Sequence, residues 1–219
     1  MQKRLTEVSK SQLDTGMPKK VDEEQRKMMI AKNAAELISE SGFSGASIRE
    51  IAKKSGISRG LVEHYFKNKD EIIEYAISWM NSRYTSRMND AAKGLKGIAA
   101  LRARLISVVP INSTRKREWR MRLRFWTSTD ARVSAAQAAR LQRGLALFEM
   151  DLIDAIEIGE IPNTIDPGKL SKRIMYITSG MCALAIANPD LFDNNFIIGE
   201  IDGCIESIKL QVPLPTHDR

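Results

Sequence analysis

Residues 47–69 read SIREIAKKSGISRGLVEHYFKNK, and this stretch decides the fold. Ser47 is suited to cap the start of a helix, and Glu50, three positions later, completes a capping box. The helix that follows has one apolar face at helical spacing, formed by Ile48, Ile51 and Ala52. Gly56 can adopt the positive φ that ends a helix in a tight turn. The pattern therefore predicts a short helix that starts after Ser47 and ends at Gly56.

A second short helix is predicted directly after this turn. Ser58 is its expected N-cap, and its buried side consists of Leu61, Val62, Tyr65 and Phe66. The spacing of Ala52, Gly56 and Val62 is typical of a helix-turn-helix that enters the DNA major groove. The alternative is an ordinary pair of short helices in an all-α protein, because each feature by itself is common. Their coincidence in one short window favours DNA binding.

Composition and charge restrict the class of protein. The chain has 219 residues, 43% of them hydrophobic and 28% charged, which is typical of a soluble globular protein of one or two domains. No apolar run approaches the roughly 20 residues of a membrane helix. The charged N-terminus is unlike a secretory signal, and Cys182 and Cys204 lack metal-ligand spacing. We expect a cytoplasmic protein with reduced thiols and no membrane segment.

The net charge of +7 is unevenly distributed along the chain. It amounts to +2 over residues 1–75, +12 over residues 76–145 and −7 over residues 146–219. A small excess in the first part is sufficient for DNA binding if the basic groups face the phosphates. The basic middle and the acidic end are expected to complement one another across the fold or a dimer.

Helical periodicity continues through the rest of the chain, without strand-like alternation. We expect an all-α protein of about nine helices, the first from Asp22 to about Ser41, where Gly42 stops it. The predicted organisation is a flexible basic tail (1–21), a three-helix DNA-binding domain (22–68), a helical effector-binding and dimerisation domain (69–211) and a loose tail (212–219). The N-terminal tail either contacts DNA or only keeps the protein soluble.

Residues 30–73 resemble the TetR family of bacterial transcriptional regulators. The likeness rests on Gly42-Phe43, Ser47 to Ala52, Ser55 to Ser58, Gly60, His64-Tyr65-Phe66 and Lys69-Asp70. The form Ser-x-Gly-x-x-x-His-Tyr-Phe-x-x-Lys-Asp is most similar to the branch of choline-responsive BetI repressors. Phe125-Trp126 resembles a Phe-Trp pair in the same region of that branch.

The resemblance implies a homodimer that represses transcription at a near-palindromic operator on double-stranded DNA and is released by a small-molecule effector. In this family the last two helices usually form the dimer's four-helix bundle, although their apolar stripes would equally suit an internal core. The dimer-interface candidates are therefore Ile174, Ile177, Met181, Ile198, Ile201 and Ile205.

The resemblance also assigns residues 58–66 to the recognition helix. Arg59, near its start, is the candidate for a bidentate contact to guanine. Glu63 stands where relatives often carry a phosphate-binding Tyr, so it either accepts from cytosine or pairs with a nearby Lys. Capping is the preferred role of the two serines, with phosphate contact as the alternative. The DNA-binding candidates are Ser47, Ser58, Arg59, Gly60, Glu63, His64, Tyr65 and Lys69, with Lys53 and Lys54 as additional charge.

The sequence identifies the effector less clearly than the DNA-binding residues. Trp119, Leu123 and Trp126 share one helix face, which suits either a core or a pocket wall, and Phe148 and Tyr176 are further pocket candidates. Aromatic walls attract cations such as choline, but the arginines and lysine of residues 115–124 would repel a cation, so an anionic or neutral apolar effector is equally compatible. With two histidines and no metal cluster or nucleophile motif, we expect no enzyme, cofactor or metal. The competing function is an architectural protein that binds DNA without sequence preference.

Overall fold

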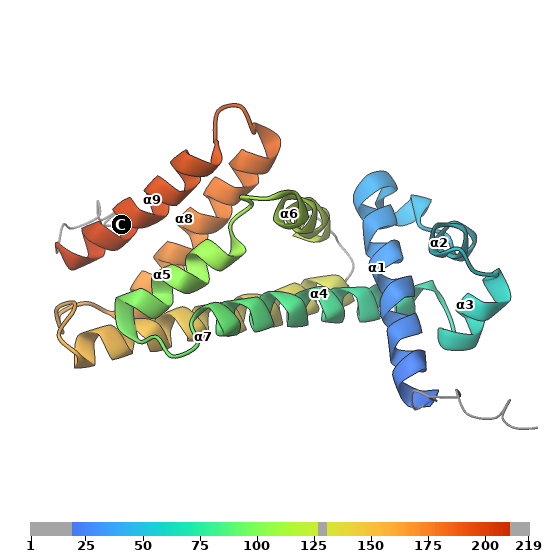
Figure 1. The fold of residues 1–219 in the computed structure, drawn as a ribbon, viewed down its shortest axis with the longest axis horizontal. Helices are drawn as coiled ribbons and strands as arrows, with labels where there is room; N and C mark the ends of the chain where they lie inside the picture. Colours follow the sequence, from blue (N-terminus) through green and yellow to red (C-terminus); the bar gives the residue numbers. More distant parts are fainter. Residues whose placement is uncertain (1–18, 127–130, 211–219) are drawn as a thin grey trace, which may run out of the picture.

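The computed structural model describes residues 19–126 and 131–210, and within these residues all regular secondary structure is helical (Figure 1). In chain order the helices are α1 (Lys19–Gly45), α2 (Ile48–Ser55), α3 (Arg59–Tyr65), α4 (Lys69–Ala91), α5 (Gly97–Val108), α6 (Ser113–Trp126), α7 (Ala131–Glu157), α8 (Pro167–Ala187) and α9 (Asn194–Lys209). The prediction of an all-α fold with about nine helices is confirmed over this range. None of the helices is long and apolar enough to cross a membrane in these described residues.

The helix α1 differs slightly from its predicted bounds. It begins at Lys19, three residues before the expected Asp22, and extends to Gly45. Gly42 nevertheless interrupts it with a φ of 76°, at the residue where the sequence predicted the end of the helix. The expectations for tail residues 1–18 and 212–219 lie outside the described residues.

The helices α1, α2 and α3 form a separate head at one end of the molecule (Figure 1). A small core joins them to the first turns of α4, and its fully buried members include Ile30, Ile51, Val62 and Ile72. Asn33 of α1 also donates a 3.0 Å hydrogen bond to Ser55 at the end of α2. The long helix α4 then connects this head to the remaining helices, as the sequence predicted.

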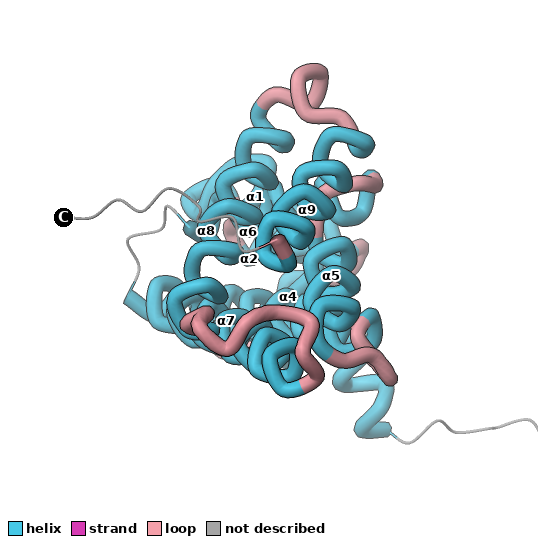
Figure 2. Tube along the Cα trace, turned by 90° about the vertical axis from the view of Figure 1, so that its left-hand side faces the viewer, coloured by secondary structure: helices cyan, strands magenta, loops and turns pink. Residues whose placement is uncertain are grey.

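The helices α4 to α9 form the body around a second, larger core. Its members include Met88, Leu101, Phe148 and Ile201. In Figure 2, turned by 90°, α8 and α9 lie in the upper part of the body, α4 and α7 lie in the lower part, and α5 lies next to α9. In this arrangement α7 packs on α5 and α8, and α9 packs on α5 and α8. Both cysteines are free thiols in the body, Cys182 buried and Cys204 partly buried.

A buried ion pair connects α5 to α7, and a hydrogen bond of the same arginine connects α5 to α4. Arg104 of α5 donates from Nε to Asp151 of α7 at 2.8 Å, and its Nη1 donates to Asn89 Oδ1 at 2.8 Å, near the end of α4. Only 8% of the Arg104 side chain and 2% of the Asp151 side chain are exposed. Burial raises the pKa of Asp151, and the charge and hydrogen bond of Arg104 oppose that rise. The buried charge of Asp151 is therefore stabilised by Arg104, and that of Arg104 by Asp151.

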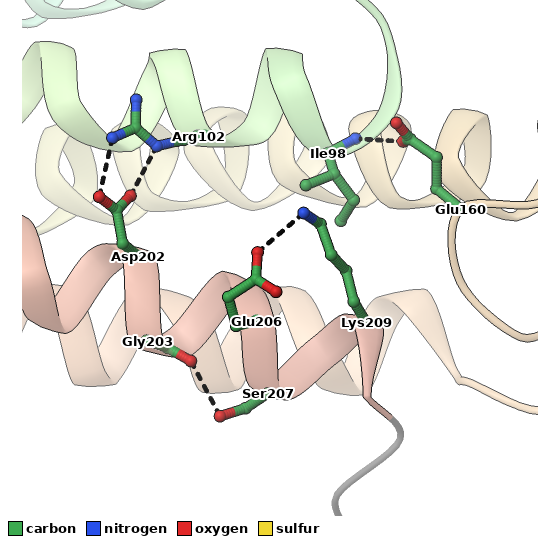
Figure 3. A network of polar contacts seen from close by, with 8 residues as sticks. All are labelled: Ile98, Arg102, Glu160, Asp202, Gly203, Glu206, Ser207 and Lys209. Carbon is green, nitrogen blue, oxygen red and sulfur yellow. Dashed lines mark hydrogen bonds and ion pairs between the residues drawn. The ribbon is translucent and has the colours of Figure 1, made fainter.

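A more exposed polar network attaches α9 to α5 (Figure 3). Arg102 donates to both carboxylate oxygens of Asp202, at 2.6 and 2.9 Å. The residue before α5, Lys96, forms no side-chain cap, and Glu160 accepts from the backbone N–H of Ile98 at 2.7 Å instead. The start of α5 is thus capped by the segment that connects α7 to α8.

The helix α6 packs against the head alongside α4. Phe125 is buried in a cluster with Ile38 of α1 and Ile73 and Ile77 of α4. Its ring meets that of Phe43 edge to face, with a centroid distance of 5.4 Å. One turn earlier, Met121 is buried against alanines of α1 and α4. A shift of α6 would consequently act on the head directly.

Candidate DNA-binding surface and effector cavity

The turn between α2 and α3 has the serine caps and the glycine that its sequence predicts, but the predicted capping box is incomplete. The N–H of Ser47 donates to the carbonyl of Gly45 at 3.1 Å and not to the side chain of Glu50. Ser47 Oγ accepts from the backbone N–H of Glu50 at 3.2 Å, which caps α2. Gly56 follows the end of α2 with a φ of 65°, and its N–H reaches the carbonyls of Ala52 and Lys53. Ser58 Oγ then accepts from the N–H of Leu61 at 3.2 Å and caps α3. The two serine hydroxyls therefore serve the helix starts, which was the preferred of their two predicted roles.

The helix α3 presents a polar face to solvent. Val62 is fully buried beneath it, and Leu61 and Tyr65 are partly buried. The exposed side chains and the exposed glycine of the helix are Arg59, Gly60, Glu63 and His64. At Gly60 an added Cβ would meet no atom within 4 Å, so the backbone there is accessible to a large partner. The candidate DNA-binding residues of this helix thus lie together on one surface.

Glu63 has a different partner from the lysine that the sequence suggested. Its carboxylate accepts from Arg59 Nε at 2.8 Å, one helical turn away, while 69% of the Arg59 side chain stays exposed. The alternative of a Glu63–Lys pair is corrected accordingly. The i, i+4 spacing of opposite charges is the signal that could have identified this pair. Since Glu63 accepts from Nε, the two terminal nitrogens of Arg59 remain available to an outside acceptor.

Two of the lysines proposed to face the DNA backbone have bonding partners within the head itself. Lys69 Nζ donates to the backbone carbonyl of Phe43 and so ties the start of α4 to the end of α1. Lys54 pairs with Glu40 at 2.7 Å and with Glu36 at 3.7 Å. By contrast, Lys53 is exposed on α2, and so is Lys67 directly after α3, which the motif analysis missed because it lies outside both helices.

A cavity of about 450 Å³ opens between the end of α6, α7 and α8. Its walls are Trp126, Gln137, Ala138, Arg140, Leu141, Leu145, Lys172, Met175, Tyr176 and Ser179. Two of the five predicted pocket residues, Trp126 and Tyr176, are therefore in its lining.

The other three predicted pocket residues do not line this cavity. Trp119 and Phe148 are buried in the core of the body, where Trp119 Nε1 donates to the carbonyl of Val108 at 2.7 Å. Leu123 packs against the same core. Their assignment to the pocket is corrected: a helical stripe of large apolar residues has the same spacing whether it faces a core or a cavity.

The predicted dimer-interface residues of α8 and α9 likewise include both buried and exposed side chains. The core of the single subunit already buries Ile174, Ile201 and Ile205. Their side chains are covered without a partner subunit, so their assignment to a dimer interface is corrected. Met181 and Ile198 are partly buried, and Ile177 is exposed. The large apolar side chains that these two helices expose are Tyr176, Ile177, Leu184 and Phe196.

One buried arginine, Arg140, lines the cavity, and a second, Arg122, lies next to it; sequence reasoning expected neither of them to be buried. Arg140 lies on α7, and Arg122 of α6 shares with Arg140 the ring of Tyr84, at 3.9 Å for Arg122 and 5.6 Å for Arg140. Arg122 also stacks on Trp119 at 4.8 Å, and Arg140 on Trp126 at 6.0 Å. Burial and the neighbouring charge of Arg122 lower the pKa of Arg140 to about 10.

Comparison with known proteins agrees with this geometry. Residues 30–76 match the family described as bacterial regulatory proteins, tetR family. The transcriptional regulator PksA of Bacillus subtilis (strain 168) is 28% identical over 205 residues, covering 93% of this chain and 99% of PksA. The regulator BetI of Yersinia pestis (strain Pestoides F) is 31% identical over 140 residues, which are 58% of this chain and 64% of BetI.

The fold is also shared with solved structures. A putative transcriptional regulator from Saccharomonospora viridis, solved in complex with choline, superposes with a TM-score of 0.75 over 84% of this chain and 96% of its own, at 18% identity. The fold, the head and these relatives define the protein as a helix-turn-helix transcriptional regulator that binds DNA. Residues 30–76 of the head match the DNA-binding domain of the TetR family. The match to BetI agrees with the likeness noted around His64, and the branch within the family stays a prediction.

Proposed function

We propose that the protein is a homodimeric repressor of the bacterial cytoplasm. In this proposal α3 of each subunit enters one half of a near-palindromic operator, and a small molecule bound in the body releases the DNA. The observation that carries the proposal is the exposed face of α3, where Arg59 and Gly60 lie beside the capped start of the helix. A helix-turn-helix reads DNA with residues near the start of its second helix.

Arg59 is the proposed base-reading residue. Its terminal nitrogens suit O6 and N7 of guanine, and Glu63 orients the guanidinium by holding Nε. His64 and Tyr65 are proposed to donate to phosphates, and the bare backbone at Gly60 allows the close approach that this requires. A Lys69 contact to phosphate would use the ammonium donors that the carbonyl of Phe43 leaves free.

Dimerisation is proposed to use the exposed apolar side chains of α8 and α9. Tyr176 is 63% exposed and Leu184 52%, and both Ile177 and Phe196 also remain uncovered in the single subunit. Glycines at 180, 199 and 203 leave open space on the same two helices. Large apolar side chains that stay exposed in a single subunit can mark an interface, so these four residues support association of two copies through α8 and α9.

The helix α6 is the proposed link between effector and DNA. Its last residue, Trp126, lines the cavity, and the preceding residue, Phe125, is buried against the head. A ligand that moves the end of α6 therefore changes the packing on α1. In a dimer this alters the spacing of the two recognition helices, which weakens operator binding.

The experiment compares operator affinity and specificity of Arg59→Ala and Lys53→Ala. Arg59→Ala is expected to cost about 1–3 kcal/mol and to relax the preference at one base pair of each half-site. Lys53→Ala removes only an exposed charge of α2, so it should weaken all sequences alike and reduce the salt dependence. Lys69→Ala is expected to weaken all sequences as well, but it also removes the bond to the Phe43 carbonyl, which makes Lys53 the better control.

Binding to a library of half-site variants distinguishes the outcomes. An unchanged sequence preference in Arg59→Ala would reject the base contact. Equal affinity of the unaltered protein for operator and random DNA would reject the regulator proposal and favour the architectural alternative.

A further inference from the structure

We infer that the effector is an amphipathic carboxylate, which binds with its apolar body in the α6–α7–α8 cavity and its head group against Arg140. This inference rests on the proposed effector-controlled function and adds the chemical class of the ligand. It is carried by the combination of an apolar cavity with two buried donor nitrogens, Gln137 Nε2 and Arg122 Nη1, that have no acceptor among the described residues.

Most of the cavity wall is apolar. Trp126, Leu141, Leu145, Met175 and Tyr176 line it from three helices, and its volume of about 450 Å³ is within the range of small-molecule sites. An aliphatic or aromatic group of a ligand would bury apolar surface here. The wall alone does not determine the charge of the head group.

Some of the polar groups in the lining of the cavity and next to it are donors that need an acceptor. Arg140 is only 5% exposed, and among the described residues its one hydrogen bond is the 3.0 Å contact from Nε to Gln137 Oε1. Gln137 Nε2 is buried and has no partner in the described part of the chain. The same holds for Nη1 of Arg122, a side chain that is 7% exposed. Buried donors are nearly always paired, so these groups indicate a missing acceptor.

The aromatic contacts do not satisfy these donors. The guanidinium carbon of Arg122 lies over the rings of Tyr84 and Trp119, and that of Arg140 over the rings of Tyr84 and Trp126. Such cation–π contacts stabilise the charge but do not replace the oxygen acceptors that the N–H donors of a guanidinium need. A carboxylate would supply these acceptors, because it accepts two parallel bonds from one arginine.

The electrostatics of the site also favour an anion. Arg140 stays protonated near neutral pH even though burial and Arg122 lower its pKa to about 10. Among the described residues no carboxylate forms an ion pair with Arg122 or Arg140, and Lys172 is the second positive side chain of the lining beside Arg140. Buried charges are costly unless they are paired. A quaternary ammonium ligand would increase this cost, and a carboxylate would relieve it.

The test is calorimetric titration of the purified full-length protein with three probes of known charge. Decanoate and 2-naphthoate are carboxylates with aliphatic and aromatic bodies, and decyltrimethylammonium is the cationic counterpart of the first. We expect at least one carboxylate to bind with one molecule per subunit, and the cation not to bind. This comparison needs no variant and is therefore independent of any folding defect.

Variants then locate the head group. Arg140→Met keeps most of the side-chain length and should weaken carboxylate binding about ten- to hundred-fold, because a charged hydrogen bond is lost. Arg143→Met, on the same helix but exposed, is the matched control and should change the affinity less than about two-fold. Circular dichroism of both variants verifies that they remain helical.

Binding of the cation as tightly as the carboxylates, binding of neither carboxylate, or unchanged affinity in Arg140→Met would each overturn the inference. Operator binding without any probe tests the proposed function separately. A protein that binds decanoate through Arg140 but binds no operator would retain this site and lose the repressor proposal. A protein that binds operator but no carboxylate would retain DNA binding and lose this inference.

Discussion

Replacing Asp151 by Asn tests how strongly the buried ion pair holds the body together. The substitution preserves the shape of the side chain and removes its charge, which leaves the guanidinium of Arg104 without its carboxylate. Both side chains are almost completely buried, and they bond at 2.8 Å. Loss of one partner of such a pair costs about 3–5 kcal/mol, and we expect the low end because Asn89 and the carbonyl of Met88 still accept from Arg104.

Asp202→Asn provides the matched control, because the partner of Asp202 is Arg102, which lies on α5 like Arg104. The Arg102–Asp202 pair has a shorter distance of 2.6 Å, but 47% and 43% of the two side chains are exposed. Its removal should cost no more than about 1 kcal/mol. The contrast between the two variants therefore depends on burial and not on the length of the ion pair.

Urea denaturation followed by circular dichroism measures both variants. The subunit concentration must be the same throughout, because the apparent stability of a dimer depends on it. A loss in Asp151→Asn that is equal to the loss in Asp202→Asn would refute the reasoning. The double variant Arg104→Met with Asp151→Leu should recover most of the stability, since both buried charges are then absent.

Three further predictions concern local stability. Gly56→Ala should destabilise the protein by about 1 kcal/mol, measured by urea denaturation, because φ at this position is 65°; unchanged stability would contradict the strained turn. Asp193→Ala should cost about 1 kcal/mol in the same assay, because Oδ1 caps α9 by accepting from Phe196 N–H at 2.7 Å, and an unaltered midpoint would argue against the cap. The third is a pH dependence, because Arg102 lowers the pKa of Asp202. The pair therefore stabilises the fold at pH values above the ordinary Asp pKa of about 3.9. This stabilisation is lost as the pH falls through the lowered pKa of Asp202. Thermal melts of the unaltered protein and of Asp202→Asn should therefore differ slightly near neutral pH and converge in acid, and a difference that grows in acid would contradict the sign.

The helices and the turn of the head could be predicted because their signals are local. Ser47, Gly56 and Ser58 act on backbone groups within a few residues, so the sequence is sufficient to identify their roles. Periodicity likewise identifies a helix without knowledge of its neighbours. The same locality explains why the position of Gly42 was predicted, although the helix resumes after it.

The division between core and surface could not be predicted from these patterns. Trp119 and Trp126 share a stripe on one helix, yet only Trp126 lines the cavity. Ile174 is buried and Ile177, one turn later, is exposed. Which of two such residues is covered depends on helices that are distant in the sequence.

The buried arginines were missed for a related reason. An arginine in a basic helix is expected to face water, and nothing in its neighbours along the chain indicates burial. Arg122 and Arg140 are buried because Tyr84, on a third helix, provides a ring for both guanidinium groups. Such a contact becomes visible only when the fold is known.

The central claim is that two copies of this chain read a specific operator, and selection of genomic DNA fragments by the purified protein at moderate salt tests it most directly. The account predicts enrichment of one short inverted repeat, whose half-sites each carry a guanine that Arg59→Ala no longer selects. Broad enrichment without a shared sequence, lost on a small increase in salt, would contradict it.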